Sequence, residues 1–407
     1  MSVIRGARTF RIVSKNLGSV KMRIVHLCLG NYFADGYSYQ ENMFTKFHMQ
    51  EGHEVYVIAS LQTYDANGKV TFMEMRKPYL TEHGVEVTRI PYKKDNKIYR
   101  KIRKFKGLAQ ALEAKAPEVL FIHNCQFADM KKVVKYLKDH PEVKVYCDSH
   151  ADYSNSATNW FSKNILHKIL WRRSAKLIEP FATKFYGVLP ARVEFLKELY
   201  KLPAEKCELL VMGADDDLVE ANLKPEVKAE IRKKYGIADD DFLLMFGGKI
   251  DLFKQQLLLL MDAVNEIDNP KLKLIVFGSV VPEMKEAIEA RVSDKVKYIG
   301  WVQSDESYPL FASCDLAVFP GRHSVFWEQV TGQGIPLLVK HWDGTTHVDI
   351  GGNVKFLYDD SKEEIKNAVL EIVNNPSVYA EMKRVAEENG MKVFSYRDIA
   401  RRSIEEV

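Results

Sequence analysis

Short apolar runs alternate with helical patterns along the chain from Met22 onward. Runs such as HEVYVIAS and EVLFIHN are rich in β-branched and aromatic residues, whereas the segments between them repeat apolar residues at a helical period. This alternation is typical of a parallel sheet covered by helices. The first series ends with KFYGVLP, and a second series begins with FLLMFGG after a polar stretch at 212–240. The pattern therefore predicts an α/β protein with two doubly wound, Rossmann-like units in tandem.

The length of the chain agrees with this organisation, because 407 residues correspond to two or three domains of about 100 to 200 residues each. We expect an N-terminal domain over 22–215 and a C-terminal domain over 216–390, joined by a linker near 213–221. Residues 1–21 are basic but lack the apolar core of a secretion signal, so we expect them to form a flexible extension.

Composition excludes several classes of protein. The chain is 46% hydrophobic and 28% charged, and its formal charge of +4 is a small difference between 59 basic and 55 acidic residues, which does not indicate a nucleic-acid partner. The five cysteines form no CxxC pair and indicate buried thiols in a reducing compartment. No stretch reaches the roughly 18 apolar residues that a membrane-spanning helix needs. We therefore expect a cytoplasmic protein.

Ligands of doubly wound sheets bind at the carboxyl ends of the strands, so the turns that follow the strands hold the candidate residues. Neither half contains GxGxxG or a P-loop, the motifs of dinucleotide enzymes and kinases. The strongest constellation is FGGKIDLFKQ, which places Gly248 after a buried strand and adds Lys249 and Lys254. Glycine lets a ligand approach the backbone, and paired ammonium groups can neutralise a diphosphate leaving group. The alternative is two solvated lysines at the start of a helix.

This segment resembles the GRL/IxxxKG element of the GT4 glycosyltransferases, whose basic pair grips the donor diphosphate. Lys249 stands where the family usually has arginine, so a bidentate fork is replaced by a point charge. Further segments follow in the family's order: LLVMGADDD resembles vIpNGvD, LIVFGS with Gly278 resembles lvivGdG, and VKYIGWV resembles fxGxv. The family's loop after this last glycine contacts the nucleotide base, which implies that role for Trp301 and Val302. Core packing is the alternative for Trp301.

The segment PGRHSVFWEQVTGQGIPLL resembles the family region PSxxExFGxxxxEAMAxGxPVV, but no acidic residue stands at the position of the first glutamate. We expect a helix to begin after Pro320 with Ser324 as its N-cap, leaving backbone N–H groups free to hold a diphosphate. Glu328 is expected to accept the ribose hydroxyls, since a carboxylate can accept two hydrogen bonds from a diol. Arg322 and His323 are candidates to replace the missing acid. The alternatives are a purely structural cap role for Ser324 and a surface role for Arg322.

In the N-terminal half, the turn GNYFADGYS resembles the family's acceptor-facing loop, with Gly30 and Gly36 as candidates. His150 with Asp152 resembles the family's HD or HG element, which faces the reacting sugar. Histidine there can donate to the sugar or orient the acceptor hydroxyl, although a histidine at a strand end is commonly just packed. His123, at the end of the preceding strand, is the weaker candidate.

Two basic and aromatic stretches, KKDNKIYRKIRKFKG and NWFSKNILHKILWRRSAK, carry Lys or Arg on one helical face and Trp, Ile and Leu on the other. Such helices can rest on an anionic membrane surface, but they also commonly only cover a sheet. Peripheral contact with the inner face of a membrane is therefore an additional expectation.

The resemblance covers about residues 22–407 and implies the GT-B fold, with two Rossmann-like domains facing a central cleft. The tail FSYRDIARRSIEEV resembles the family's closing helix, which implies that 391–407 completes the N-terminal domain. The implied activity is retaining, metal-independent transfer of a hexose from a UDP- or GDP-sugar to a hydroxyl of a glycan or lipid-linked acceptor, as in polysaccharide biosynthesis, without a cofactor. Two alternatives stay open: a nucleotide-sugar epimerase of the same fold, and a non-catalytic protein that binds nucleotide sugars.

Overall fold

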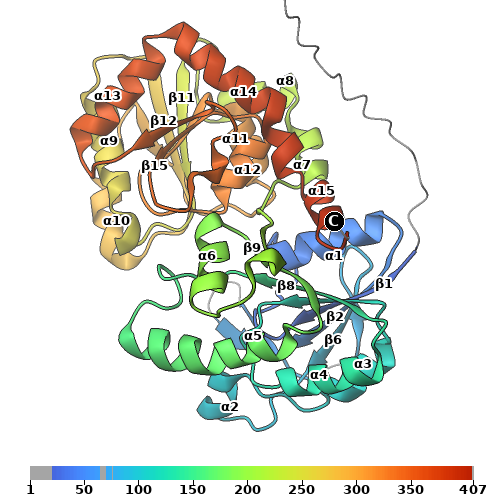
Figure 1. Cartoon of the computed structure of the whole chain (residues 1–407). Helices are drawn as coiled ribbons and strands as arrows, with labels where there is room; N and C mark the ends of the chain where they lie inside the picture. Colours follow the sequence, from blue (N-terminus) through green and yellow to red (C-terminus); the bar gives the residue numbers. More distant parts are fainter. Residues whose placement is uncertain (1–20, 65–69, 76, 406–407) are drawn as a thin grey trace, which may run out of the picture.

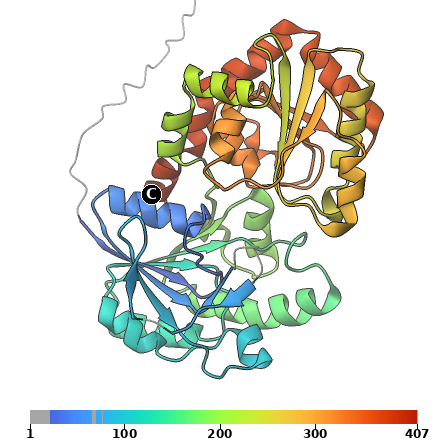
Figure 2. The same cartoon turned by 180° about the vertical axis from the view of Figure 1, so that it is seen from behind.

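The computed structural model describes residues 21–64, 70–75 and 77–405 of the chain. Nearly all of the extension expected at 1–21 therefore lies outside the described residues. The described chain forms two lobes, each built on its own sheet, and the second lobe lies above the first in Figure 1. Seen from behind (Figure 2), helices cover both faces of each sheet.

The first lobe contains an eight-stranded sheet with the order β10-β9-β8-β7-β1-β2-β6-β5. Its neighbouring strands are parallel except for the β5–β6 pair. The strands are β1 (Arg23–Cys28), β2 (Glu54–Ser60), β5 (Tyr79–Leu80), β6 (Glu86–Ile90), β7 (Val119–His123), β8 (Lys144–Ser149), β9 (Ala182–Gly187) and β10 (Cys207–Leu209). The helices are α1 (Gln40–Gln50), α2 (Lys97–Ile102), α3 (Leu108–Lys115), α4 (Met130–Asp139), the π-helix η1 (Ser162–Trp171), α5 (Arg172–Ile178) and α6 (Pro190–Glu198).

The second lobe contains a six-stranded, fully parallel sheet with the order β13-β12-β11-β14-β15-β16. The strands are β11 (Phe242–Gly247), β12 (Leu272–Phe277), β13 (Val296–Tyr298), β14 (Leu316–Phe319), β15 (Leu337–Lys340) and β16 (Val354–Leu357). The helices of this half of the chain are α7 (Asp216–Asn222), α8 (Pro225–Lys234), α9 (Gln256–Glu266), α10 (Pro282–Glu289), α11 (Ser307–Ser313), α12 (Phe326–Gly332), α13 (Lys362–Val373), α14 (Pro376–Phe394) and α15 (Tyr396–Arg402). The strand order reverses between β11 and β14, and a ligand crevice forms at such a switch point.

Burial explains why the sequence marked these strands clearly. Every residue of β7 and of β14 is buried, because helices cover both faces of each sheet. Strands of this kind need nearly continuous apolar sequence rather than alternation. The expected α/β class with two doubly wound sheets is confirmed.

One expected helix is wrong. The basic segment from Lys101 to Ala114 has a sequence pattern that favours one long helix, but α2 ends at Ile102 and α3 begins at Leu108. Between them the backbone bonds back to an earlier segment, with the N–H of Lys93 donating to the carbonyl of Lys104 at 2.8 Å. This tertiary pairing outweighs the local helical preference.

Two segments of the chain cross between the lobes side by side. The N–H of Ala214 donates to the carbonyl of Phe394 at 2.7 Å, and the N–H of Tyr396 donates to the carbonyl of Ala214 at 3.0 Å. Gly213 permits this contact, since a Cβ there would lie 2.4 Å from the carbonyl oxygen of Phe394. Beyond the crossing, α15 returns to the first lobe and packs beside α1 (Figure 1). None of the described helices is both long and apolar enough to cross a membrane.

Candidate functional site

The switch point of the second sheet brings several predicted site residues together. Gly248 follows β11 with a φ of 125°, a conformation that favours glycine. A Cβ at this position would lie 3.6 Å from Nζ of Lys254 and 3.7 Å from Oγ of Ser324. The backbone of Gly248, the ammonium group of Lys254 and the hydroxyl of Ser324 therefore share one small region at the carboxyl end of β11.

The turns after three neighbouring strands stack on one another beside this region. The N–H of Gly278 donates to the carbonyl of Gly300 at 2.7 Å. Gly278 has a φ of 132°, and a Cβ there would lie 1.8 Å from the carbonyl oxygen of Gly248. Trp301 follows these turns with 66% of its surface exposed, so it does not pack in the core, whereas Val302 is half-buried.

The two lysines occupy different environments. Lys254 is half-buried at the end of a 3-10 turn, which begins where the Asp251 side chain accepts a hydrogen bond from the N–H of Phe253. Burial lowers the pKa of the Lys254 ammonium, Asp251 opposes this shift, and the nearby Lys249 adds to it. Lys249 is largely exposed, with its Nζ 3.8 Å from Oδ2 of Asp251. A bound anion would therefore stabilise the charged form of Lys254 in particular.

The expected N-cap is wrong. Helix α12 begins at Phe326 with Val325 at its N-cap, one position after Ser324. The carbonyl of Ser324, rather than its hydroxyl, accepts the first helical bond, from the N–H of Trp327 at 2.9 Å. Its Oγ makes only a 3.5 Å contact with the N–H of Phe326. The N-cap thus lies one residue later than expected, and the Ser324 hydroxyl remains available near Gly248.

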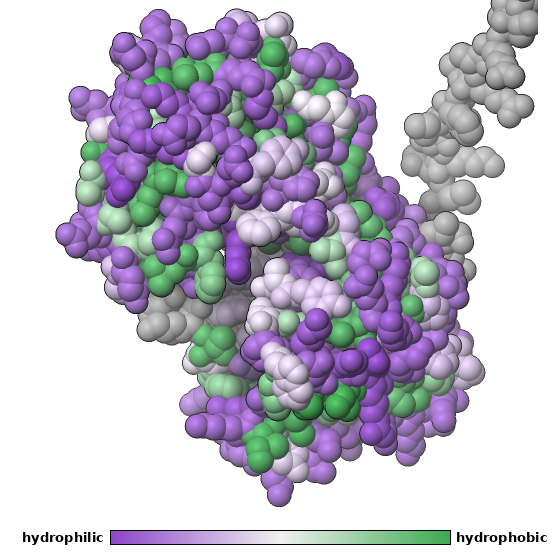
Figure 3. All heavy atoms as spheres, turned by 60° about the vertical axis from the view of Figure 1, so that its left-hand side comes forward, coloured by the Kyte–Doolittle hydropathy of each residue, from purple (hydrophilic) through white to green (hydrophobic). Residues whose placement is uncertain are grey.

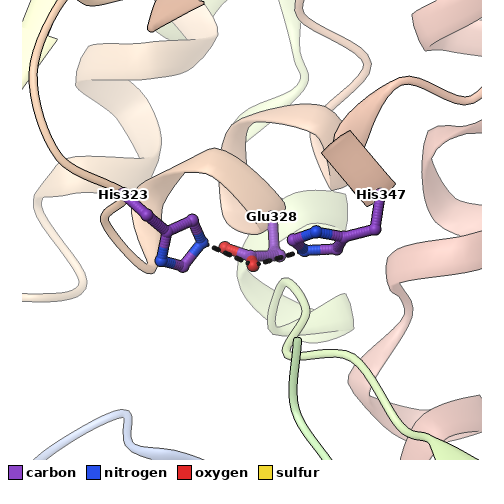
Figure 4. Close-up of side chains that lie close together, drawn as sticks. All are labelled: His323, Glu328 and His347. Atoms are coloured by element: carbon purple, nitrogen blue, oxygen red, sulfur yellow. Dashed lines mark hydrogen bonds and ion pairs between the residues drawn. The ribbon is translucent and has the colours of Figure 1, made fainter. Parts of the chain in front are cut away.

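Glu328 is completely buried between two imidazoles (Figure 4). Its Oε1 accepts hydrogen bonds from Nε2 of His323 and from Nε2 of His347, each at 2.8 Å. Burial opposes ionisation of this carboxyl, but the two imidazoles outweigh burial and lower its pKa to about 2. Its Oε2 is buried without a hydrogen-bond partner. The side chain expected to accept ribose hydroxyls is therefore already bonded to two histidines.

The ligand atoms of these three side chains lie within 4.8 Å of one another, a spacing that a metal ion could also use. The O···N distances of 2.8 Å are those of hydrogen bonds. His323 keeps 13% of its side chain exposed, whereas His347 keeps 4%. His323 is therefore the member of the group that is most accessible to a ligand.

Asp152 shapes its own loop rather than standing free. Its Oδ1 accepts the N–H groups of Ser154 and Asn155, at 2.7 and 3.0 Å, and its Oδ2 accepts Nε of Arg192 at 3.1 Å. Burial lowers the pKa of Arg192, and the charges of Asp152, Glu328 and Asp148 oppose that shift. Arg192 thus lies near acidic groups of both lobes.

Sequence reasoning missed both Arg192 and His347. Arg192 belongs to the ordinary-looking helix α6, and His347 follows β15 in the segment DGTTHVDIGG. Helix α6 touches the second lobe directly, because the N–H of Ala191 donates to the carbonyl of Gly344 at 3.1 Å. No local pattern marks residues whose importance depends on such a contact.

The remaining candidates lie at the carboxyl ends of the first sheet. His150 follows β8, keeps 24% of its side chain exposed, and has its Nε2 3.6 Å from Oδ2 of Asp148. Gly30 is required by packing, since a Cβ there would lie 2.0 Å from the carbonyl oxygen of Asn124. Gly36 has a φ of 74° and open space around it. Figure 3 shows the surface of the molecule hollowed between its two lobes.

Comparison with known proteins agrees with this geometry. Residues 241–375 match the family described as glycosyl transferases group 1. An uncharacterized glycosyltransferase of Methanocaldococcus jannaschii is 24% identical over 156 residues, which cover 37% of this chain and 40% of that relative. The match therefore spans less than half of the length of the curated relative.

Among the solved structures that resemble this fold are two that cover most of the chain. The Anabaena protein HepE in complex with UDP has a TM-score of 0.66 at 15% identity and covers 94% of this chain and 98% of its own. A putative UDP-N-acetylglucosamine 2-epimerase from Listeria monocytogenes has a TM-score of 0.60 at 12% identity and covers 94% and 95%. At these identities the likeness shows the fold, and it confirms the expected GT-B architecture. Together with the family match, it also confirms the resemblance to the GT4 family.

Proposed function

We propose that this chain, which has the GT-B fold and resembles the group 1 glycosyl transferases, transfers a sugar from a nucleoside diphosphate sugar to a hydroxyl group. This proposal rests on four residues that lie close together at the carboxyl ends of the strands of the second sheet: Gly248, Gly278, Ser324 and Lys254. Backbone that a ligand can approach closely, beside a half-buried ammonium group, suits a diphosphate. The proposed acceptor is a glycan or a lipid-linked glycan.

Each predicted residue has a role in this proposal. Lys254, assisted by Lys249, neutralises the diphosphate as its charge develops, so the transfer needs no metal ion. Trp301 and Val302 contact the base, which belongs to a UDP- or GDP-sugar. Glu328 contributes to donor binding by holding His323 and His347 in place. The transferred sugar is a hexose, and its configuration is retained.

On the acceptor side, His150 orients the attacking hydroxyl. Asp152 shapes the loop that follows His150, and the turns at Gly30 and Gly36 border the acceptor.

The domain limits at residues 215 and 390 also stay a prediction.

The first test is a thermal-shift screen with UDP, GDP, ADP, CMP and the common nucleotide sugars, combined with an assay for released nucleoside diphosphate. We expect stabilisation by one diphosphate, since binding to the native state alone raises its stability. We also expect slow release of that diphosphate from its sugar conjugate, unchanged by EDTA. The absence of any shift would contradict the diphosphate site, and loss of release with EDTA would contradict metal independence.

An epimerase is the second candidate, because the fold also resembles that of the putative Listeria epimerase. An epimerase would convert the nucleotide sugar without an acceptor, whereas a transferase would release nucleoside diphosphate. A non-catalytic binding protein would be stabilised by the donor and would do neither. Product analysis with and without acceptor therefore separates the three.

We also propose that the first lobe rests on an anionic membrane surface. The two basic stretches meet there, with Nζ of Lys101 4.9 Å from the ring centroid of Phe161. Large apolar side chains are exposed on the same elements, including Ile98 at 68%, Trp160 at 71% and Ile169 at 60%. The stretch from 159 to 176 contains no acidic residue. Cationic and apolar side chains on one surface suit the boundary of an anionic bilayer.

Flotation with vesicles tests this surface. We expect the protein to float with phosphatidylglycerol vesicles, to remain at the bottom with phosphatidylcholine vesicles, and to lose flotation when Trp160→Ser and Ile169→Ser are combined. Trp301→Ser, which alters a tryptophan of similar exposure on the second lobe, is the control. Equal behaviour with both kinds of vesicle would exclude the anionic surface.

A further inference from the structure

Three buried histidines form a continuous row through the first lobe, outside the donor site. His48 on α1 lies between the carbonyl of Ala400 on α15, at 2.7 Å from its Nε2, and His26 on β1, at 3.1 Å from its Nδ1. His26 continues the row to His123 on β7, with 2.9 Å between its Nδ1 and Nε2 of His123. Nδ1 of His123 then lies 2.7 Å from Oδ2 of Asp148 on β8. All three imidazoles are completely buried.

The hydrogen bonds of this row need more hydrogens than three neutral imidazoles supply. Each of the four contacts needs one hydrogen, because two facing lone pairs repel and two facing N–H groups collide. Both ends of the row are acceptors when Asp148 is ionised. Three neutral imidazoles supply only three hydrogens. The row can therefore be complete only if it holds one additional proton.

The carboxylate of Asp148 lies 2.7 Å from Nδ1 of His123, and an opposite charge at this distance favours the additional proton on that histidine. Burial alone would raise the pKa of Asp148, but His123 and then His150 outweigh it and hold that pKa below its usual range. Burial also lowers the pKa of His26, and it lowers that of His48 to about 3. An imidazolium at His123 can donate from both nitrogens, to Asp148 and to His26. His26 then donates from Nε2 to His48, and His48 donates from Nε2 to the carbonyl of Ala400.

The other titratable and charged groups around the row belong to neighbouring elements. Glu41 lies on α1, and burial raises its pKa. His53 precedes β2 and faces His48 with 6.1 Å between ring centroids. His150 follows β8, and Arg192 on α6 is close enough to Asp148 for their charges to interact. None of these groups is hydrogen-bonded to the three imidazoles. The Oγ of Ser403 lies 3.5 Å from Nε2 of His48, but it donates its own hydrogen to the carbonyl of Ala400, so Nε2 of His48 faces acceptors only.

We propose that His123 is a buried imidazolium paired with Asp148, and that this pair makes Asp148 the positioning residue for His150. The second half rests on the proposed function. The N–H of Asn124 holds the other oxygen, Oδ1, of Asp148 at 2.9 Å. A carboxylate fixed in this way presents Oδ2 to Nε2 of His150. The distance between these two atoms is 3.6 Å, and Nε2 of His150 is buried without a hydrogen-bond partner. Pairing at Nε2 leaves Nδ1 of His150 as the nitrogen for an acceptor hydroxyl.

The substitution D148N tests the proton count directly, because it preserves shape. Its amide oxygen would still accept from Asn124, and its NH₂ group would donate to Nδ1 of His123, so three neutral imidazoles would complete the row. We expect ¹⁵N NMR of histidine-labelled protein at pH 7 to show one doubly protonated buried imidazole in the wild type and none in D148N. H123Q assigns the signal, and His167, a buried histidine bonded to Tyr200 outside the row, is the internal control.

A wild-type spectrum with three singly protonated imidazoles in the row would overturn the imidazolium. A doubly protonated imidazole that persists in D148N would overturn it as well. This measurement needs no substrate, so its outcome is independent of whether the chain is a transferase. If transfer is found, we expect D148N to lower kcat at least ~10-fold, to leave KM for the donor unchanged, and to shift the pH profile of kcat. An unchanged kcat and pH profile would overturn the positioning role while leaving the imidazolium intact.

Discussion

Lys254→Ala is expected to slow the release of nucleoside diphosphate by about 30- to 1000-fold in kcat, equivalent to a loss of about 2 to 4 kcal/mol of transition-state stabilisation. The physical reason is the half-buried position of this ammonium group, 3.6 Å from where a Cβ of Gly248 would lie. A charge there interacts more strongly with a developing diphosphate than a charge in bulk water does. The measurement is kcat for nucleoside diphosphate release with the donor that the thermal-shift screen selects.

Two further variants make this result specific. Lys285→Ala removes an exposed lysine on α10, whose side chain is 70% exposed, and should leave kcat unchanged. Lys254→Arg keeps the charge and should recover part of the lost rate. Donor turnover at the wild-type rate in Lys254→Ala would show that the diphosphate lies elsewhere.

Gly278→Ala is expected to lower the free energy of unfolding by about 2 to 6 kcal/mol and to abolish nucleotide binding. A positive φ costs a residue with a Cβ about 1 to 3 kcal/mol, and forcing an atom into packed structure costs about 1 to 3 kcal/mol more. Both terms apply here, since the φ is 132° and the new Cβ would lie 1.8 Å from the carbonyl oxygen of Gly248. Urea denaturation measures the stability, and a thermal shift with the diphosphate measures the binding.

The neighbouring turn provides the control for this prediction. Gly300 has a φ of 82°, but its Cβ would meet open space. Gly300→Ala should therefore show only the conformational cost of about 1 to 2 kcal/mol. Equal losses in the two variants would mean that the close approach between Gly278 and Gly248 does not matter.

The central strands of both sheets could be predicted because burial on two faces demands continuous apolar sequence, as in VLFIH of β7 and LAVF of β14. The break between α2 and α3 could not. It depends on the backbone bond between Lys93 and Lys104, and helical periodicity carries no information about such a partner.

The candidate site divides in the same way. Glycines and a lysine after a buried strand are a local signal, and they led directly to Gly248 and Lys254. Arg192 and His347 gave no such signal, because each is defined by groups that lie far away in sequence. His26 sits inside the apolar run RIVHLC, where a sequence pattern gives no sign that it faces two other histidines.

The paired crossings at Ala214 and Phe394 have a mechanical consequence. Because the two connections are hydrogen-bonded to each other, at 2.7 Å and 3.0 Å, the lobes are joined along one edge rather than at two separated points. Lys46 on α1 strengthens that edge by donating to both carboxylate oxygens of Asp215 at 2.7 Å. A rotation of the lobes about this edge would preserve these bonds, but it would shift the contact between Ala191 on α6 and Gly344 on the second lobe. Such a rotation can close the crevice over a ligand while α15 remains docked on α1.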